Sequence, residues 1–169
     1  MERRIRVKVQ AEPKALEAVR GLVRGFARSW GLPSGRVDEI VLAVNEACSN
    51  SIRHSYRSDP ARSFVLAMGA TDRYLEFELR DSGKPAPREH VAVSRRTRPK
   101  QGELRPGGLG VGLIYQVFDE VVFEPGRTRG NRVLMRALRG NQNRKCRSGT
   151  AQCAEKGPNM HGRTQDPKT

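Results

Sequence analysis

RVDEIVLAVNEACSNSIRHSY, residues 36–56, is the stretch that decides the fold of this 169-residue chain. Its apolar residues recur at three- and four-residue spacing, which predicts one long helix with an apolar face toward a core. These residues are Val37, Ile40, Val41, Val44, Cys48 and Ile52. At about 100° per residue, Glu46, Asn50 and Arg53 fall in a narrow sector almost opposite that face. We therefore expect these three polar side chains to share a face that points away from the core.

The segments on both sides of this helix predict a sheet. Strands are indicated by alternating apolar and polar residues, and the expected ranges are 4–9, 63–69, 73–80, 121–123 and 132–138. Two further helices are expected at 13–30 and about 109–118. Because strands and helices do not alternate, a doubly wound fold does not fit. We predict the α+β class, as a two-layer α/β sandwich with the helices on one face of a mixed, mostly antiparallel sheet.

The length and the distribution of apolar residues indicate one domain followed by a tail. Apolar residues make up 36% of the chain and are concentrated between Ile5 and Leu138. We expect a domain over 1–139 and a basic, disordered tail over 140–169, where no periodicity occurs. Residues 84–106 are rich in Pro, Gly and Arg, and a loop of this length inside a domain is typical of a lid.

Composition excludes several classes of protein. No apolar run approaches the roughly 20 residues that cross a bilayer, and no signal peptide is evident, so a soluble, cytoplasmic protein without a membrane contact is expected. The positions of Cys48, Cys146 and Cys153 predict neither a disulfide scaffold nor a zinc site. The net charge of +14 suits nucleic acid, acidic proteins or polyphosphates. Aromatic and basic residues are not interleaved, so no direct nucleic-acid contact is expected.

The polar helix face has the chemistry of phosphoryl transfer. The amide oxygen of Asn50 is a suitable hard ligand for Mg²⁺, and the Glu46 carboxylate can accept a proton from an attacking hydroxyl. The small residues Ala43 and Ala47 flank this sector and leave room for a ligand to approach. The alternative is an ordinary polar helix face, which every amphipathic helix has.

Two further motifs suit a nucleotide. Asp81-Ser82-Gly83 follows an expected strand and is either a plain turn or a carboxylate for the exocyclic amine of adenine, with Gly83 allowing close approach. PGGLGVG, residues 106–112, opens the third helix, where free N–H groups and the positive helix end would hold phosphates. It lacks Gly-Lys-Ser/Thr and follows a polar loop, so it matches neither common nucleotide fingerprint. A flexible linker is the alternative.

The order of these motifs carries a resemblance to a known family. The motifs are Glu46-x-x-x-Asn50, Asp81-x-Gly83 and Gly108-x-Gly110-x-Gly112. In this succession they resemble the anti-sigma-factor serine-protein kinases (RsbW-like), a branch of the histidine-kinase-like, gyrase-type ATPases. The strings AVNEACSN, residues 43–50, and GGLGVGLI, residues 107–114, are particularly similar to that branch. The resemblance spans about 5–138 and implies a Bergerat-type ATP-binding fold.

The resemblance implies a role for each motif residue. Glu46 would be the catalytic base for a serine hydroxyl, Asn50 would bind ATP and Mg²⁺, Asp81 would bind the adenine amine, and Gly83 would form the turn beside the base. The residues implied to bind the phosphates are Gly108, Leu109, Gly110, Val111 and Gly112. The lid arginines available to the γ-phosphate or to a protein substrate are Arg88, Arg95, Arg96, Arg98 and Arg105. Pro85 replaces a commoner glycine and stiffens the start of the lid.

The resemblance also implies a function. Members of this family are ATP- and Mg²⁺-dependent protein-serine kinases that phosphorylate an anti-anti-sigma partner and sequester a sigma factor. The alternative is an ATP-binding, partner-switching module without significant kinase activity. Whether the chain forms a homodimer stays open.

Overall fold

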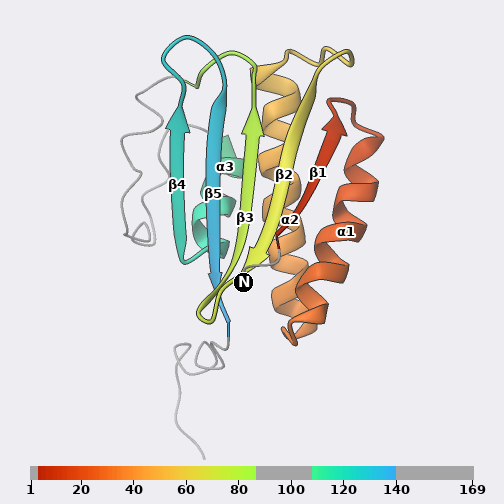
Figure 1. The fold of residues 1–169 in the computed structure, drawn as a ribbon, viewed down its shortest axis with the longest axis vertical. Helices are drawn as coiled ribbons and strands as arrows, with labels where there is room; N and C mark the ends of the chain where they lie inside the picture. The colour runs from red at the N-terminus through yellow and green to blue at the C-terminus, as the bar shows by residue number, and fades with distance from the viewer. Residues whose placement is uncertain (1–3, 87–107, 140–169) are drawn as a thin grey trace, which may run out of the picture.

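The computed structural model describes residues 4–86 and 108–139, which form two layers (Figure 1). The elements, in chain order, are β1 (Ile5–Gln10), α1 (Ala15–Ser29), α2 (Ser34–Asn50), the π-helix η1 (Ser51–Ser55), β2 (Ser63–Ala70), β3 (Tyr74–Asp81), α3 (Gly108–Val117), β4 (Glu120–Pro125) and β5 (Asn131–Leu138). The helices lie on one face of the sheet. The predicted α+β, two-layer class is therefore confirmed.

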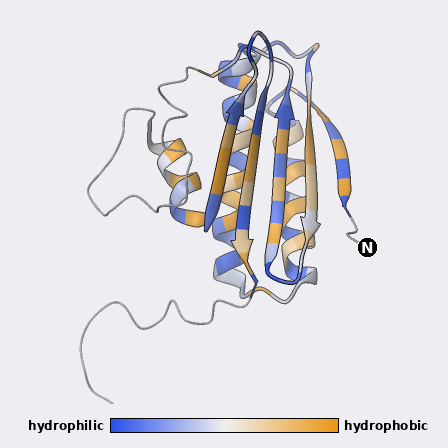
Figure 2. Ribbon diagram, turned by 60° about the vertical axis from the view of Figure 1, so that its left-hand side comes forward, coloured by the Kyte–Doolittle hydropathy of each residue, from blue (hydrophilic) through white to orange (hydrophobic). Residues whose placement is uncertain are grey.

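The described sheet has five strands in the order β1-β2-β3-β5-β4. Every neighbouring pair is antiparallel, so this sheet is not mixed. Successive side chains of a strand point to opposite faces, and Figure 2 shows hydrophobic and hydrophilic residues alternating along the strands. On the central strand β3, Phe77 lies opposite Met68 of β2 and Met135 of β5, and all three are buried.

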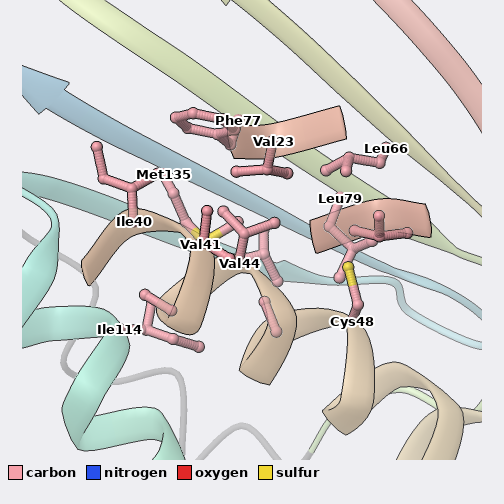
Figure 3. Close-up of a cluster of buried hydrophobic side chains, with 14 of the residues drawn as sticks. Val23, Ile40, Val41, Val44, Cys48, Leu66, Phe77, Leu79, Ile114 and Met135 are labelled. Atoms are coloured by element: carbon pink, nitrogen blue, oxygen red, sulfur yellow. The ribbon is translucent and has the colours of Figure 1, made fainter. Parts of the chain in front are cut away.

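The core lies between the sheet and the helices (Figure 3). Val23 of α1 and Val44 of α2 are fully buried there with Leu66, Phe77 and Met135 of the sheet. Burying one such side chain stabilises the folded state by roughly 1.5–3 kcal/mol. The apolar face that the sequence predicts for residues 36–56 is the face of α2 that covers this core.

The other face of the sheet carries two carboxylates that are almost completely buried, at 6% exposure each. Glu76 accepts hydrogen bonds from Arg136, at 2.8 Å, and from Arg4, at 2.9 Å. Glu78 accepts from Arg80, at 2.6 Å, and from Arg132, at 2.7 and 2.9 Å. Burial alone would raise the pKa of Glu78, but the hydrogen bonds from the two arginines outweigh burial and hold this pKa below its ordinary value.

The prediction of one continuous helix over 36–56 is wrong in its last turn. The α-helix ends at Asn50, and η1 follows, in which the Tyr56 N–H bonds to the Ser51 carbonyl at 3.0 Å. This wider turn places the bond five residues back instead of four. Arg57 and Ser58 follow with φ angles of 53° and 61°, and the chain then turns toward β2. A pattern of apolar residues cannot separate the two kinds of turn over so short a stretch.

Some expectations lie outside the described residues. These expectations concern most of the lid, its five arginines, the tail, Cys146 and Cys153. The division of the chain into domain, lid and tail therefore stays a prediction. Among the helices of residues 4–86 and 108–139, none is long and apolar enough to span a membrane.

Candidate functional site

The polar face of α2 is arranged as the sequence predicts. Arg53 Nη2 donates to Glu46 Oε1 at 3.2 Å and to Asn50 Oδ1 at 3.3 Å. The three side chains therefore converge, although the turn geometry changes between Asn50 and Arg53. The Arg53 side chain is 54% exposed and that of Glu46 is 24% exposed. An ion pair this exposed contributes only about 0–1 kcal/mol, so its main effect is to orient the two oxygens.

Helix α3 covers part of this face. A Cβ atom at Gly110 would overlap the Glu46 carboxylate, so the close approach of the two helices depends on glycine at this position. The expected free space beside Ala43 and Ala47 is not open, because these residues are 0% and 3% exposed. A partner of Glu46 must therefore approach past Arg53 or past the first turns of α3.

Residues 108–112 of the glycine stretch are helical, in line with the third helix expected over about 109–118. Helix α3 begins at Gly108, so residues 108–112 make up its first turn and a little more. The N–H groups at the start of a helix have no partner within it, and here they include those of residues 108–110. Gly112 is the fifth residue, so its N–H is positioned to bond to the Gly108 carbonyl. The N–H groups without a partner inside the helix thus lie at the positive end of α3.

Asp81 ends the central strand and is surrounded by hydrogen-bond donors. Its Oδ2 atom accepts from Ser51 Oγ and Ser55 Oγ, both at 2.9 Å, and Oδ1 accepts from the Gly83 N–H at 3.0 Å. Asn131 Nδ2 lies 3.0 Å from Oδ1 and 3.2 Å from Oδ2. A carboxylate has about four lone-pair sites, and these donors occupy them. An adenine amine could reach Asp81 only if a serine hydroxyl turned away.

The π-helix η1 carries both serines that contact Asp81. The hydroxyls of Ser51 and Ser55, one at each end of η1, donate to the same carboxylate oxygen. The turn after β3 approaches η1 so closely that a Cβ at Gly83 would overlap the Ser55 carbonyl. The Lys84 N–H also donates to that carbonyl, at 2.8 Å. Gly83 is therefore required where the sequence places it.

Asn131, the first residue of β5, ties the chain after this turn to the site. Its Oδ1 accepts from the Ala86 N–H at 2.7 Å, and its Nδ2 donates to the Lys84 carbonyl at 2.9 Å. Sequence reasoning missed Asn131, Ser51 and Ser55. The only cue for Asn131 is its place after Gly130 at the start of an expected strand, and the two serines look like ordinary helix residues.

Comparisons with known proteins show the family of this chain. The family model of the histidine kinase-like ATPase domain matches residues 9–137. The chain belongs to this family. Two curated relatives are the serine-protein kinases RsbW of Oceanobacillus iheyensis and of Bacillus subtilis, each 27% identical to it. The matches span 122 and 120 residues, which are 69% of this chain in both cases and 76% and 75% of the relatives. The RsbW-like resemblance is confirmed.

Two solved structures share the fold of this histidine kinase-like ATPase chain. The RsbU and RsbW domains of a Mycobacterium tuberculosis protein give a TM-score of 0.57 at 17% identity, over 80% of this chain and 32% of that one. The SiaB–SiaC complex from Pseudomonas aeruginosa gives 0.63 at 11% identity, over 78% of this chain and 88% of the matched one. At these identities the likeness concerns the fold alone.

The donor set on α2 fits a magnesium ion that is held mainly by phosphates. Within residues 4–86 and 108–139, no group of three or more His, Cys, Asp or Glu residues could hold a metal ion. Mg²⁺ usually keeps several waters and takes only one or two protein ligands beside the phosphates of a substrate. In this member of the ATPase family, Asn50 Oδ1 suits that role, but Arg53 now donates to the same atom. The guanidinium would have to leave Asn50 for the ion to bind.

Proposed function

We propose that this chain is an ATP-dependent serine/threonine-protein kinase and anti-sigma factor. It would phosphorylate a serine of an anti-anti-sigma partner and sequester a sigma factor. The observation that carries the proposal is the continuity of the site. Glu46 and Asn50 are joined through Arg53, and Ser51, the next residue, bonds to Asp81. The relatives named serine-protein kinase RsbW support the same activity.

Each part of the site has a separate task in this proposal. Mg-ATP supplies the phosphoryl group that is transferred. Asp81 and Gly83 bind the adenine, with one serine hydroxyl turned aside, and the N–H groups at the start of α3, in residues 108–111, bind the phosphates, with Gly112 supporting this helix end. Asn50 holds the magnesium ion. Glu46 takes the proton from the serine hydroxyl of the partner. The serine oxygen forms a bond to the γ-phosphorus as the bond between that phosphorus and ADP breaks.

A second candidate is an ATP-binding, partner-switching module without significant kinase activity. The contacts of Glu46 favour it, because Arg53 donates to one carboxylate oxygen and Gly110 lies against the same group. A serine hydroxyl can reach Glu46 only when these contacts open. If they stay closed when ATP binds, nucleotide binding would control the partners without phosphoryl transfer.

Measuring ATP binding and phosphoryl transfer separately on the full chain distinguishes the candidates. The transfer assay uses ATP labelled at the γ-phosphate and a panel of candidate antagonist proteins. Glu46→Gln keeps the shape of the side chain but removes the proton acceptor, so transfer should fall by about 10²–10⁴-fold while ATP still binds. Transfer that is as fast in Glu46→Gln would exclude Glu46 as the base.

The nucleotide pocket is tested with Asp81→Asn. The variant places an NH₂ group among donors, so ATP affinity should fall, and circular dichroism checks that the variant is folded. Asp72→Asn is the matched control, because it removes the same charge at an exposed turn. If the wild-type chain does not bind ATP, both candidates fail. Binding without transfer to any antagonist leaves the partner-switching module.

A further inference from the structure

A pocket of about 460 Å³ opens at the end of the sheet where β3 ends and β5 begins. Three chain segments line it: the loop after η1, the turn after β3 and the β4–β5 hairpin. All three lie at the upper end of the molecule in Figure 1. The volume falls within the range of about 300–1,000 Å³ that small-molecule sites occupy. None of Glu46, Asn50 and Gly110 lines this pocket, so it is separate from the groups proposed to carry out phosphoryl transfer, although Gly83 of the proposed adenine site lies in its wall.

The lining is strongly basic. Its cationic side chains belong to Arg57, Arg62, Lys84 and Arg129, and its one carboxylate is that of Asp59. Arg62 Nε lies 3.2 Å from Asp59 Oδ2, so these two charges compensate each other. No ion pair joins the other three cations to a carboxylate within the described ranges, 4–86 and 108–139. The pocket therefore presents an excess of positive charge that an anionic ligand would neutralise.

The remaining polar groups of the lining narrow the class of anion. Two further hydroxyl-bearing residues, Ser82 and Thr128, line the pocket beside the cations, whereas the Ser55 hydroxyl already donates to Asp81. Arginine forks and hydroxyl donors together suit the several oxygens of a phosphate group, which accepts more hydrogen bonds than a carboxylate. We propose that this pocket binds a phosphate monoester, with Arg57, Lys84 and Arg129 neutralising the phosphate and the hydroxyls completing its shell of donors.

The wall of this phosphate pocket is also the support of Asp81. Gly83 lines the pocket, and its N–H donates to Asp81 Oδ1 at 3.0 Å. The Gly130 N–H donates to the Gly83 carbonyl at 2.8 Å, which fastens the hairpin that carries Arg129 to the same turn. Gly130 has a φ angle of +81°, and a Cβ there would lie 2.7 Å from the Asp81 carbonyl oxygen. A phosphate that draws Lys84 and Arg129 together must therefore act on the turn that holds Asp81.

This connection predicts a coupling between two ligands. A phosphate monoester in the pocket changes the affinity of the chain for ATP, and ATP changes the affinity for the phosphate by the same factor. The coupling rests on the proposed function, because it needs ATP at Asp81. Binding of the phosphate by itself does not need ATP, so the two ideas can fail separately.

The test is a titration of the nitrogen-15-labelled full chain, followed by the amide NMR signals of Lys84, Thr128 and Arg129. The probes are inorganic phosphate and a short peptide with one phosphoserine, and the comparison peptide has aspartate in its place. These arms separate free phosphate from a phosphorylated side chain as the source. The phosphoserine peptide should give saturable shifts at the three amides and bind more tightly than the aspartate peptide.

A pair of double variants tests which charges matter. The double variant Arg57→Ala/Arg129→Ala should lower the affinity for the phosphate probe by about tenfold or more, because each lost charged hydrogen bond supplies a large fraction of the binding free energy. Lys14→Ala/Arg28→Ala removes the same charge from exposed positions of the α1 region and should leave the affinity unchanged. If the first double variant does not fold by circular dichroism, the exposed Lys84→Gln takes its place.

Several results would overturn the pocket. One is an equal loss of affinity for the phosphate probe in both double variants. Another is an affinity for the aspartate peptide equal to that for the phosphoserine peptide. Either result would mean a general attraction to a basic surface. Shifts at Gly110 without shifts at the three pocket amides would place the phosphate in the nucleotide site instead. A wild-type chain that binds ATP but neither probe would reject the pocket and leave the proposed function intact.

Discussion

Replacing Gly110 by alanine should disable Glu46 and leave the fold intact. The added methyl group would overlap the Glu46 carboxylate, which is the flexible end of a side chain and can turn away. Glu46 would then lose its contact with Arg53 and leave the position from which it could take a proton. Gly112→Ala is the control in the same helix, because a Cβ there meets no described atom within 4 Å.

The structure sets the expected size of both effects. Alanine in place of glycine inside a helix stabilises it by about 0.5–1 kcal/mol, and Gly112→Ala should show this gain in full. In Gly110→Ala, the loss of an exposed ion pair costs about 0–1 kcal/mol, and an unfavourable Glu46 rotamer costs about 0.5–1.5 kcal/mol. These costs offset the gain, so Gly110→Ala should be close to wild type in its free energy of unfolding.

Thermal unfolding followed by circular dichroism measures this difference. The stabilisation expected for Gly112→Ala corresponds to a rise in Tm of about 2–6 °C, while the Tm of Gly110→Ala should hardly change. Phosphoryl transfer by Gly110→Ala should fall about as far as in Glu46→Gln. The reasoning is refuted if Gly110→Ala is stabilised as much as Gly112→Ala and still transfers phosphate at the wild-type rate.

Two predictions concern titratable groups away from the site. Glu78→Gln should lower the free energy of unfolding near neutral pH by about 1–3 kcal/mol, because Arg132 and Arg80 lose a charged acceptor. Since the pKa of Glu78 is held below its ordinary value of 4.5, its contribution is present above that pH and is lost as the pH falls further. Urea unfolding of both chains from about pH 7 to pH 3 should show their difference shrinking below pH 4.5, and a constant difference would contradict the role of its charge. Burial raises the pKa of the Cys48 thiol to about 12, so a thiol reagent at about pH 8 should label Cys48 only in denaturant, as peptide mass spectrometry can verify.

The helix-borne part of the site could be predicted from the sequence because helical spacing fixes directions. Glu46, Asn50 and Arg53 share a face at about 100° per residue, and the contacts of Arg53 confirm this. The fold class followed in the same way from segments with period two or near 3.6. These inferences depend only on residues that are close together in the sequence.

The parts that sequence reasoning missed depend on distant or irregular contacts. Asn131 meets Asp81 because β5 pairs with β3, and strand order is not encoded in local periodicity. Ser51 and Ser55 reach Asp81 because η1 packs against the end of β3. Gly110 was expected to face phosphates at the start of the third helix, and its contact with Glu46 in α3 was not foreseen. Each of these depends on how two elements pack, which no single stretch of sequence determines.

The buried acid–base pairs on the open face have a consequence for how the strands align as the chain folds. If β5 slid by one residue along β3, Arg132 and Arg136 would turn into the apolar core. A slide by two residues would keep the faces but set Leu134 or Leu138 opposite Glu76, where Arg136 now lies. A buried carboxylate without its partner is costly. The pairs therefore destabilise shifted registers of β5 along β3 more than they stabilise the correct register.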